Sequence, residues 1–578
     1  MLLYCISIRM RRIFLALGAL SIILFIYANP ASALTPQEEA AQAAERLQRE
    51  QQERLQQQLL KDAARRHETI PIQPPVVTQP ALPTVSGCRD VREIVLSGVT
   101  LLPDHVKEEL TASYRGKCLS VGDIEKMLSE ILKAYIDRGY IAVRPYIRAQ
   151  DLSSGVLEIL VVEGGVEKIM LEDGGKQRIN MTTAFPLLEG KPLNLRDIEQ
   201  GLDQVNRLGS NNATMQVRPG TKAGDSIIAI SNKPAFPVSA SITMDNLGSS
   251  STGKAQLGGT ISLDSPLWLN DFLTYTHRES ILENRDKKLS KMDSVFYSIP
   301  FGYALFSLAY NHSEYLTTIK AALFEMTTSG SSDSYTGRLD WVAYRDQNQK
   351  LTSSAAFTYK SSKNYLNEDY LGVSSRDLAI LDLDLNWNGR LWGSVVNLGI
   401  GYSQGLAVFD ALKDQSDAPN DFPHAQGGKL RYSAGIFYPF DFVSKLTASF
   451  SSQLSGQYAL GALYGSEQVS VGSYYTVRGF DKNSLSGDRG HYIRNEFVVT
   501  IPETPISGMT LRPFVGLDAG RIEQYNSTKA ATLVGFAAGL RYSGKYLSGE
   551  LSLAQPISAP SDMKMEPTLF YATLALMF

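Results

Sequence analysis

From about residue 233 onward, short segments of alternating apolar and polar residues follow one another, separated by turn residues. In "LAILDLDLNW", Asp382, Asp384 and Asn386 share one face, and leucines occupy the other. This period of two residues is typical of β-strands with one apolar and one polar face. We count about sixteen such segments, an even number within the range of known membrane barrels. Residues 313–345 fit either a strand or part of a long loop.

The N-terminal residues predict export. Residues 1–33 combine three arginines, the apolar run "IFLALGALSIILFIYA" and the small residues "ASA", which is the pattern of a cleavable signal peptide. The alternative is an N-terminal membrane anchor. Cleavage would remove Cys5 and leave Cys88 and Cys118 as the remaining cysteines. A lone pair in an exported chain suggests a disulfide, and two free buried thiols are the alternative.

Alternation alone fits both a soluble β-sandwich and a membrane barrel, whose apolar face meets lipid. Export favours the barrel, and all four tryptophans lie in this region, as girdle residues would. The C-terminal "TLFYATLALMF" also resembles the last strand of outer-membrane barrels, with Phe578 as the terminal insertion signal. We therefore predict a transmembrane β-barrel of about 16 antiparallel strands over 233–578. The sheet must close, because hydrocarbon does not tolerate open strand edges.

Two segments precede the folded parts of the chain. Residues 34–69 are rich in Ala, Glu, Gln, Arg and Leu, which favour helix. The apolar stripe of this predicted helix is thin, so it suits either a solvated spacer or a helix that plugs a polar channel. Residues 70–84 carry five prolines and predict an extended linker.

Residues 85–163 and 164–232 share one plan. Each has a strand, two helical segments and two closing strands. "SVGD" (120–123) predicts a helix start in the first unit, and Asn194 predicts one in the second. This β–α–α–β–β order, twice in tandem, resembles POTRA domains, which precede outer-membrane barrels in the periplasm. We expect POTRA 1 and POTRA 2 at these boundaries.

The glycine-rich stretch at about 455–490 interrupts the strand pattern. In the strand that begins near Met509, side-chain alternation places Gly516, Asp518 and Gly520 on the polar, lumenal face. A carboxylate in a narrow lumen needs a cationic partner, and Arg478 on the loop can bind it through two parallel hydrogen bonds. The loop would then fold inward; the alternative is a solvated loop arginine.

Several motifs identify a family in combination. "VRGF" (Val477, Arg478, Gly479 and Phe480), "LSGDRG" (485–490) and "RNE" (494–496) resemble the signature loop of the Omp85 superfamily. Together with "AQDLSSGVLEILVVEG", "DNLGSSSTG" and the order of segments, they resemble more closely the TpsB transporters of two-partner secretion. The resemblance implies a loop-barrel salt bridge between Arg478 and Asp518, and a pore plugged by the 34–69 helix. Phe480 stands where many relatives have tyrosine.

The resemblance implies an outer-membrane translocator that exports a TpsA-type exoprotein, unfolded and β-rich, to the surface of a Gram-negative cell. Expected further partners are outer-membrane lipid, lipopolysaccharide and the barrel-assembly machinery. The alternatives are a barrel-assembly insertase of the same superfamily and a general porin-type channel. Net charge is −3, with 56 basic and 59 acidic residues, so nothing suggests a nucleic-acid partner. We find no catalytic motif, no metal cluster among the six scattered histidines and no cofactor site.

Overall fold

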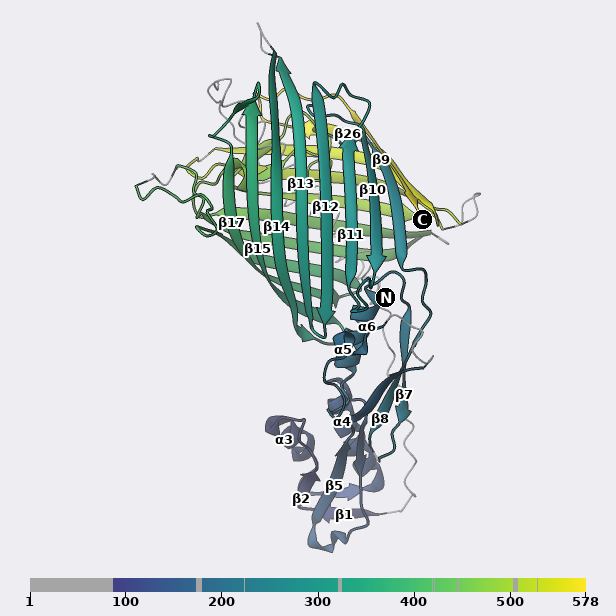
Figure 1. Cartoon of the computed structure of the whole chain (residues 1–578). Helices are drawn as coiled ribbons and strands as arrows, with labels where there is room; N and C mark the ends of the chain where they lie inside the picture. Colours follow the sequence, from purple (N-terminus) through teal and green to yellow (C-terminus); the bar gives the residue numbers. More distant parts are fainter. Residues whose placement is uncertain are drawn as a thin grey trace.

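The computed structural model places a large β-barrel above two small α/β units that follow one another along the chain (Figure 1). The described residues are 87–172, 179–222, 224–320, 325–417, 419, 421–443, 446–502, 508–527 and 529–578. The predicted signal peptide (1–33), plug helix (34–69) and proline-rich linker (70–84) lie outside these residues.

The first α/β unit packs two helices against a three-stranded sheet with the order β2-β5-β4. Its elements are β1 (Cys88–Val91), β2 (Glu93–Ser97), α3 (Asp104–Ala112), β3 (Lys117–Ser120), α4 (Val121–Ile136), β4 (Val143–Tyr146), η1 (Leu152–Ser154) and β5 (Val156–Glu163). The apolar stripe of α4 supplies the core: Met127, Ile131 and Tyr135 are fully buried, as are Leu157 and Ile159 of β5.

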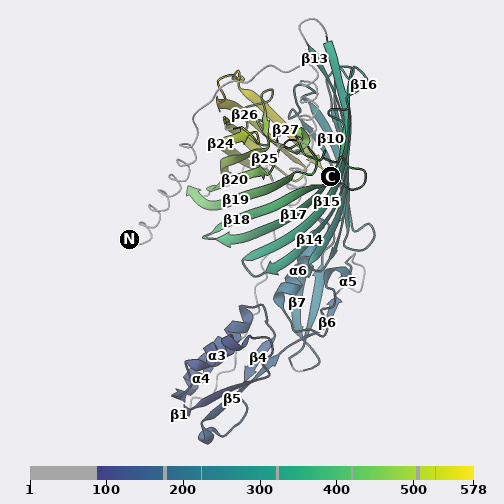
Figure 2. The same cartoon turned by 90° about the vertical axis from the view of Figure 1, so that its left-hand side faces the viewer.

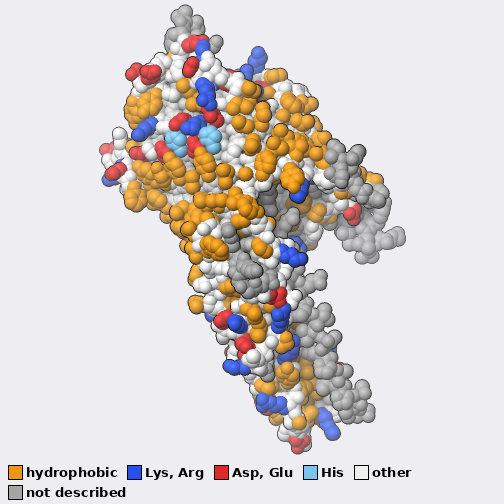
Figure 3. Space-filling model, turned by 45° about the vertical axis from the view of Figure 1, so that its right-hand side comes forward, with side chains coloured by type: hydrophobic (Ala, Val, Ile, Leu, Met, Phe, Trp, Pro, Cys, Tyr) orange, Lys and Arg blue, Asp and Glu red, His pale blue; other side chains and the backbone are white. Residues whose placement is uncertain are grey.

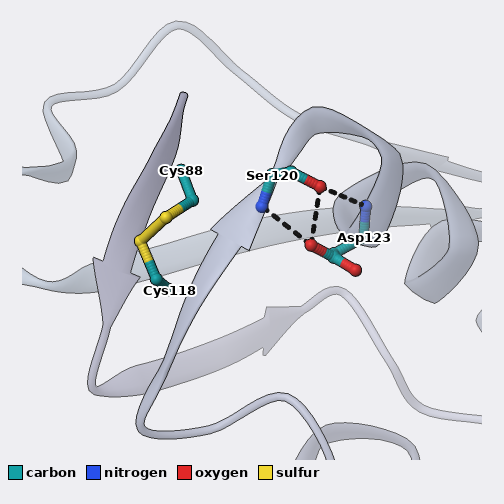
Figure 4. The surroundings of a disulfide bond; sticks show 4 residues. All are labelled: Cys88, Cys118, Ser120 and Asp123. Carbon is teal, nitrogen blue, oxygen red and sulfur yellow. Dashed lines mark hydrogen bonds between the residues drawn. A yellow bond between two sulfur atoms is a disulfide. The ribbon is translucent and has the colours of Figure 1, made fainter. Parts of the chain in front are cut away.

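A disulfide and a helix cap fix the start of this unit (Figure 4). Strands β1 and β3 pair antiparallel, and the disulfide joins Cys88 to Cys118 across this pair. Closing a loop of 30 residues stabilises the fold by about 3–4 kcal/mol in the chain-entropy account. At the start of α4, the Ser120 and Asp123 side chains each accept a hydrogen bond from the other residue's backbone N–H, forming a capping box.

The second α/β unit has a sheet with the order β6-β8-β7. Its elements are β6 (Val166–Leu171), α5 (Met181–Ala184), α6 (Leu195–Asn206), β7 (Ala213–Pro219) and β8 (Ser226–Asn232). Asn194 caps α6 as its sequence position predicts, because its side-chain oxygen accepts the Arg196 N–H. The buried face of α6 meets β8, whose Ile228 and Ile230 are fully buried.

Sixteen principal strands form the closed barrel, as the sequence pattern predicts. They are β9 (Val238–Asp245), β10 (Gln256–Asp264), β11 (Phe272–Ser280), β12 (Lys288–Phe301), β13 (Ala304–Lys320), β14 (Glu325–Arg345), β15 (Gln349–Leu366), β17 (Arg376–Leu391), β18 (Ser394–Leu406), β19 (Gly428–Val443), β20 (Leu446–Ala459), β23 (Arg489–Thr500), β24 (Thr510–Glu523), β25 (Ala530–Ser543), β26 (Leu547–Ser558) and β27 (Leu569–Met577). A two-residue strand, β16 (Asp369–Tyr370), extends the edge of β15. Of the stretch 313–345, left open by the pattern, residues 313–320 belong to β13 and residues 325–345 form β14.

The barrel is apolar outside and polar inside. Hydrophobic side chains form a broad band over its outer wall (Figure 3). Along β12, Val295 is 37% exposed, whereas Ser294 and Ser298, which share the opposite face of the strand, are buried. This arrangement is that of a barrel surrounded by lipid. Within the described residues, no helix has the length and apolar character needed to cross a membrane.

The second α/β unit is docked on the barrel, between it and the first unit (Figure 2). The Gln200 and Gln204 side chains of α6 donate to the Gly302 carbonyl in the β12–β13 turn, at 3.2 and 3.0 Å. Arg345 at the end of β14 reaches back to Asp203, with Nη1 and Oδ2 2.5 Å apart. Burial raises the pKa of the Glu199 carboxyl at this interface, although nearby arginines oppose the shift. These contacts fix α6 on the rim of the barrel.

Candidate functional site: a loop anchored inside the barrel

Residues 460–488, which we call the inward loop, connect β20 to β23 and fold into the barrel. A short hairpin of β21 (Val469–Val471) and β22 (Leu485–Gly487) forms its stem. Val477 and Phe480 are buried against Val471, Ile522 and Leu533. The loop is therefore packed like a protein core, and the structure places the "VRGF" residues at its centre.

Arg478 joins this loop to the barrel wall through a buried ion pair. Its Nε donates to Asp518 Oδ2 at 2.6 Å, and its Nη2 donates to Asp518 Oδ1 at 2.8 Å. The backbone N–H of Arg478 also donates to Asp518 Oδ2, at 3.2 Å. Both side chains are 0% exposed. The bidentate geometry satisfies both charges and fixes the orientation of the loop.

A second carboxylate extends this pair into a network. Arg478 Nη1 lies 2.5 Å from Oε1 of Glu496 on β23. Glu496 also binds Arg541 of β25, which in turn binds Glu550 of β26 at 2.7 Å. Tyr474 on the loop donates to Glu550 at 2.9 Å. The loop is therefore bonded directly to β23, β24 and β26, and Arg541 of β25 joins two of these carboxylates to each other.

Arg478 and Asp518 were predicted from the sequence, whereas Arg541 and Glu550 were not. Glu496 is part of the "RNE" motif, but no role was predicted for it. The signal was present: each lies on the lumenal face of a strand whose opposite face is apolar. Alternation can place such a charge inside a barrel, but it cannot say which other lumenal charge lies opposite.

Glycines of the barrel wall leave the space that the loop occupies. A Cβ atom built on Gly516 would lie 2.3 Å from Arg478 Nη2, and one on Gly520 would lie 2.8 Å from a Val471 methyl. On β25, a Cβ on Gly535 would lie 1.8 Å from the Arg478 carbonyl oxygen. The strand motif Gly516, Asp518 and Gly520 thus supplies both the charge and the room for the loop.

The remaining predicted positions lie elsewhere. Phe578 is 70% exposed, and its backbone N–H donates to the Ala240 carbonyl at 2.9 Å, so the last residue extends the contact between β27 and β9. Cys88 and Cys118 lie in the first α/β unit. Among the described residues, no group of three or more His, Cys, Asp or Glu side chains could hold a metal ion.

Comparisons with known proteins agree with this architecture. Residues 224–542 match the family "Haemolysin secretion/activation protein ShlB/FhaC/HecB". Residues 90–164 match the ShlB-type POTRA domain, and residues 165–219 match a further POTRA domain.

Individual relatives span most of the chain. It is 33% identical over 497 residues to the outer membrane transporter CdiB of Dickeya dadantii, covering 85% of this chain and 87% of that protein. It is 32% identical over 476 residues to the hemolysin transporter protein ShlB of Serratia marcescens, covering 82% and 83%. The solved structure of CdiB from Escherichia coli superposes with a TM-score of 0.84 at 29% identity, covering 95% of this chain and 100% of that one.

These matches fix the location and the class of activity. The relatives are transporters of the outer membrane, so the barrel lies in that membrane and the two POTRA domains lie in the periplasm. The chain is a transporter and not an enzyme. It belongs to the ShlB/FhaC/HecB family, the outer-membrane translocators of two-partner secretion.

Proposed function

We propose that this translocator captures an unfolded, β-rich exoprotein of the TpsA type through its POTRA domains and passes it through the barrel to the cell surface. The observation that carries the proposal is the combination of exposed POTRA strand edges below a barrel that holds the anchored inward loop. The related ShlB and HpmB are named as hemolysin transporters, which supports a secreted protein as the cargo.

The POTRA domains provide strand edges for the cargo. In the described residues, β7 of POTRA 2 pairs with β8 alone. The Asn206 side chain bonds both backbone groups of Ala213 at the start of its other edge, and the rest of that edge is open within the described part of the chain. The side chains of Thr214, Gln216 and Arg218 are exposed along it. An extended segment can add to such an edge as a further strand, bound by main-chain hydrogen bonds. The contacts of α6 with the barrel do not involve this edge, and the proline of β7 is the last residue of its strand. In contrast, β4 of POTRA 1 has only four residues and carries a proline inside them.

The inward loop is the proposed translocation element. Val477, Arg478, Gly479 and Phe480 lie inside the barrel, where an exported chain would pass them. The Arg478–Asp518 pair holds them there. No nucleotide is needed in this account, because folding of the cargo outside removes it from the equilibrium across the pore.

We propose three further partners for the barrel. Its apolar outer band would contact outer-membrane lipid, and the segments above that band would contact lipopolysaccharide. The barrel-assembly machinery would insert the chain and would read the terminal strand that ends at Phe578. The pairing of this strand with β9 makes it the edge that closes the barrel.

Site-specific photo-cross-linking in cells tests the capture step. A photoreactive residue at Thr214 or Gln216 should cross-link to one large protein in the periplasm. A probe at Glu109, exposed on α3 away from the β7 edge, is the matched control. The cross-linked protein should also disappear from the cell surface when the gene is deleted. Equal cross-linking from all three positions, or cross-links only to unfolded barrel proteins, would contradict the proposal.

A further inference from the structure

At the tip of the inward loop, the carboxylate of Glu566 binds three backbone N–H groups. Three consecutive backbone N–H groups, those of Asp481, Lys482 and Asn483, donate to Glu566 at 3.1, 3.0 and 2.9 Å. The Asn483 side chain adds a bond to the Lys564 carbonyl at 2.9 Å. Converging N–H groups of this kind form a concave binding site for an anion, and here the anion is part of the same chain.

The barrel closes where β27 pairs with β9, and the loop tip contacts one residue on each side of this pairing, Glu566 and Lys254. Residues 559–568, which include Glu566, connect β26 to the last strand, β27. Lys254 lies between the first two strands, β9 and β10, and its Nζ is 2.9 Å from Asp481 Oδ2. Residues 481–483 therefore contact the connections of both the first and the last strand.

The pairing of these two strands is short. Strands β27 and β9 align over five residue pairs, from Thr573 with Asp245 to Met577 with Ser241. The adjacent pairs β26–β27 and β9–β10 each align over eight. Side-chain bonds supplement the short pairing, since Asn246 accepts from the Ala572 N–H and donates to the Phe570 carbonyl, both at 2.8 Å. The loop tip contacts the chain beside this short β27–β9 pairing, which we call the seam.

We propose that Glu566 is a positioning residue for the "VRGF" loop, and that Glu566 and Lys254 hold the loop tip across the seam between β27 and β9. Arg478 fixes the centre of the loop to β23 and β24. Glu566 fixes its tip, three residues further on, near the closing strands. Two anchors, one on β23 and β24 and one on the connection between β26 and β27, determine both the position and the rotation of the intervening Gly479 and Phe480, which one anchor cannot do.

Amide exchange of the purified full-length protein tests the contact directly. In Glu566→Ala, the amides of residues 481–483 lose a charged acceptor, so their exchange should accelerate at least about tenfold. Glu566→Gln keeps one carbonyl acceptor and should give an intermediate rate. Asp562→Asn, an exposed carboxylate on the same connection, is the control and should leave the rates unchanged. Folding is checked by the unchanged exchange of the barrel strands.

The role in export rests on the function proposed above, so it is measured separately, as the amount of cargo that reaches the surface. Glu566→Ala should lower that amount several-fold, with Glu566→Gln between it and the parent protein. Exchange at 481–483 no faster than in Asp562→Asn would overturn the contact itself. Faster exchange with undiminished export would overturn the positioning role. The exchange result needs no cargo, so it stands even if the proposed function fails.

Discussion

Replacement of Arg478 by alanine removes the anchor at the centre of the inward loop. Asp518 would lose two charged hydrogen bonds and keep the one from the backbone N–H of residue 478. The next cation, Arg494, lies 4.0 Å from it. Glu496 would remain paired, since Arg541 still donates to both of its oxygens. The cost therefore falls on Asp518, a carboxylate with 0% exposure.

Breaking a buried ion pair from one side destabilises the folded arrangement by about 3–5 kcal/mol. Applied to loop docking, this lowers the ratio of docked to undocked loop by roughly two to four orders of magnitude. We expect Arg478→Ala to abolish export or reduce it sharply, while the barrel still inserts. Export is measured as cargo at the surface, docking as protection of residues 471–480 from amide exchange, and insertion as barrel protein in the outer-membrane fraction.

The double variant Arg478→Ala/Asp518→Ala separates the pair from its surroundings. Removing both partners leaves no unpaired charge, so the double variant should undock the loop no more than the worse single variant. Arg521→Ala, which removes a partly exposed pair with Glu523, is the control and should change docking by less than about 1 kcal/mol. Undiminished export in Arg478→Ala, with normal insertion, would refute the role assigned to this arginine.

Four further outcomes are expected. Deleting 34–69 should raise the ion conductance of the barrel in planar bilayers and spare most export; unchanged conductance would remove the plug hypothesis. Gly535→Ala places a Cβ against the loop backbone and should undock the loop, whereas Gly259→Ala, which has open space around it, should not. Cys88→Ser should lower the free energy of unfolding of POTRA 1 by about 3–4 kcal/mol, read from amide exchange of its strands, and Cys118 should resist alkylation in the parent protein until reductant is added. Because burial raises the pKa of Glu199, the folded state binds its proton more tightly; the free energy of unfolding should increase as the pH falls from neutral and decrease as the pH rises through that pKa, and Glu199→Gln should lose this dependence.

Local patterns were sufficient to predict most of the fold. Alternation gave the number of barrel strands, and it placed one of them at the segment that begins near Met509, which is β24. Side-chain parity along this strand predicted that Asp518 faces the lumen. Such features depend on neighbours in sequence, so one chain suffices to see them.

Contacts between distant segments were beyond the sequence pattern. Which lumenal charge meets Glu496 depends on the register of β23, β24 and β25, and no single strand carries that information. The docking of α6 depends on the Gly302 carbonyl, a backbone group that every residue possesses. The link between Glu566 and residues 481–483 joins segments about 85 residues apart through backbone N–H groups, which leave no mark in the amino-acid sequence.

The most direct measurement compares the proteins released or displayed by a strain that lacks this gene with those of the same strain carrying it again. Export of a dedicated partner predicts the loss of one large surface or secreted protein and its return on complementation. An unchanged surface with altered permeability to small solutes would contradict the account in favour of a porin-type channel. Broad loss of outer-membrane barrels would contradict it in favour of an insertase.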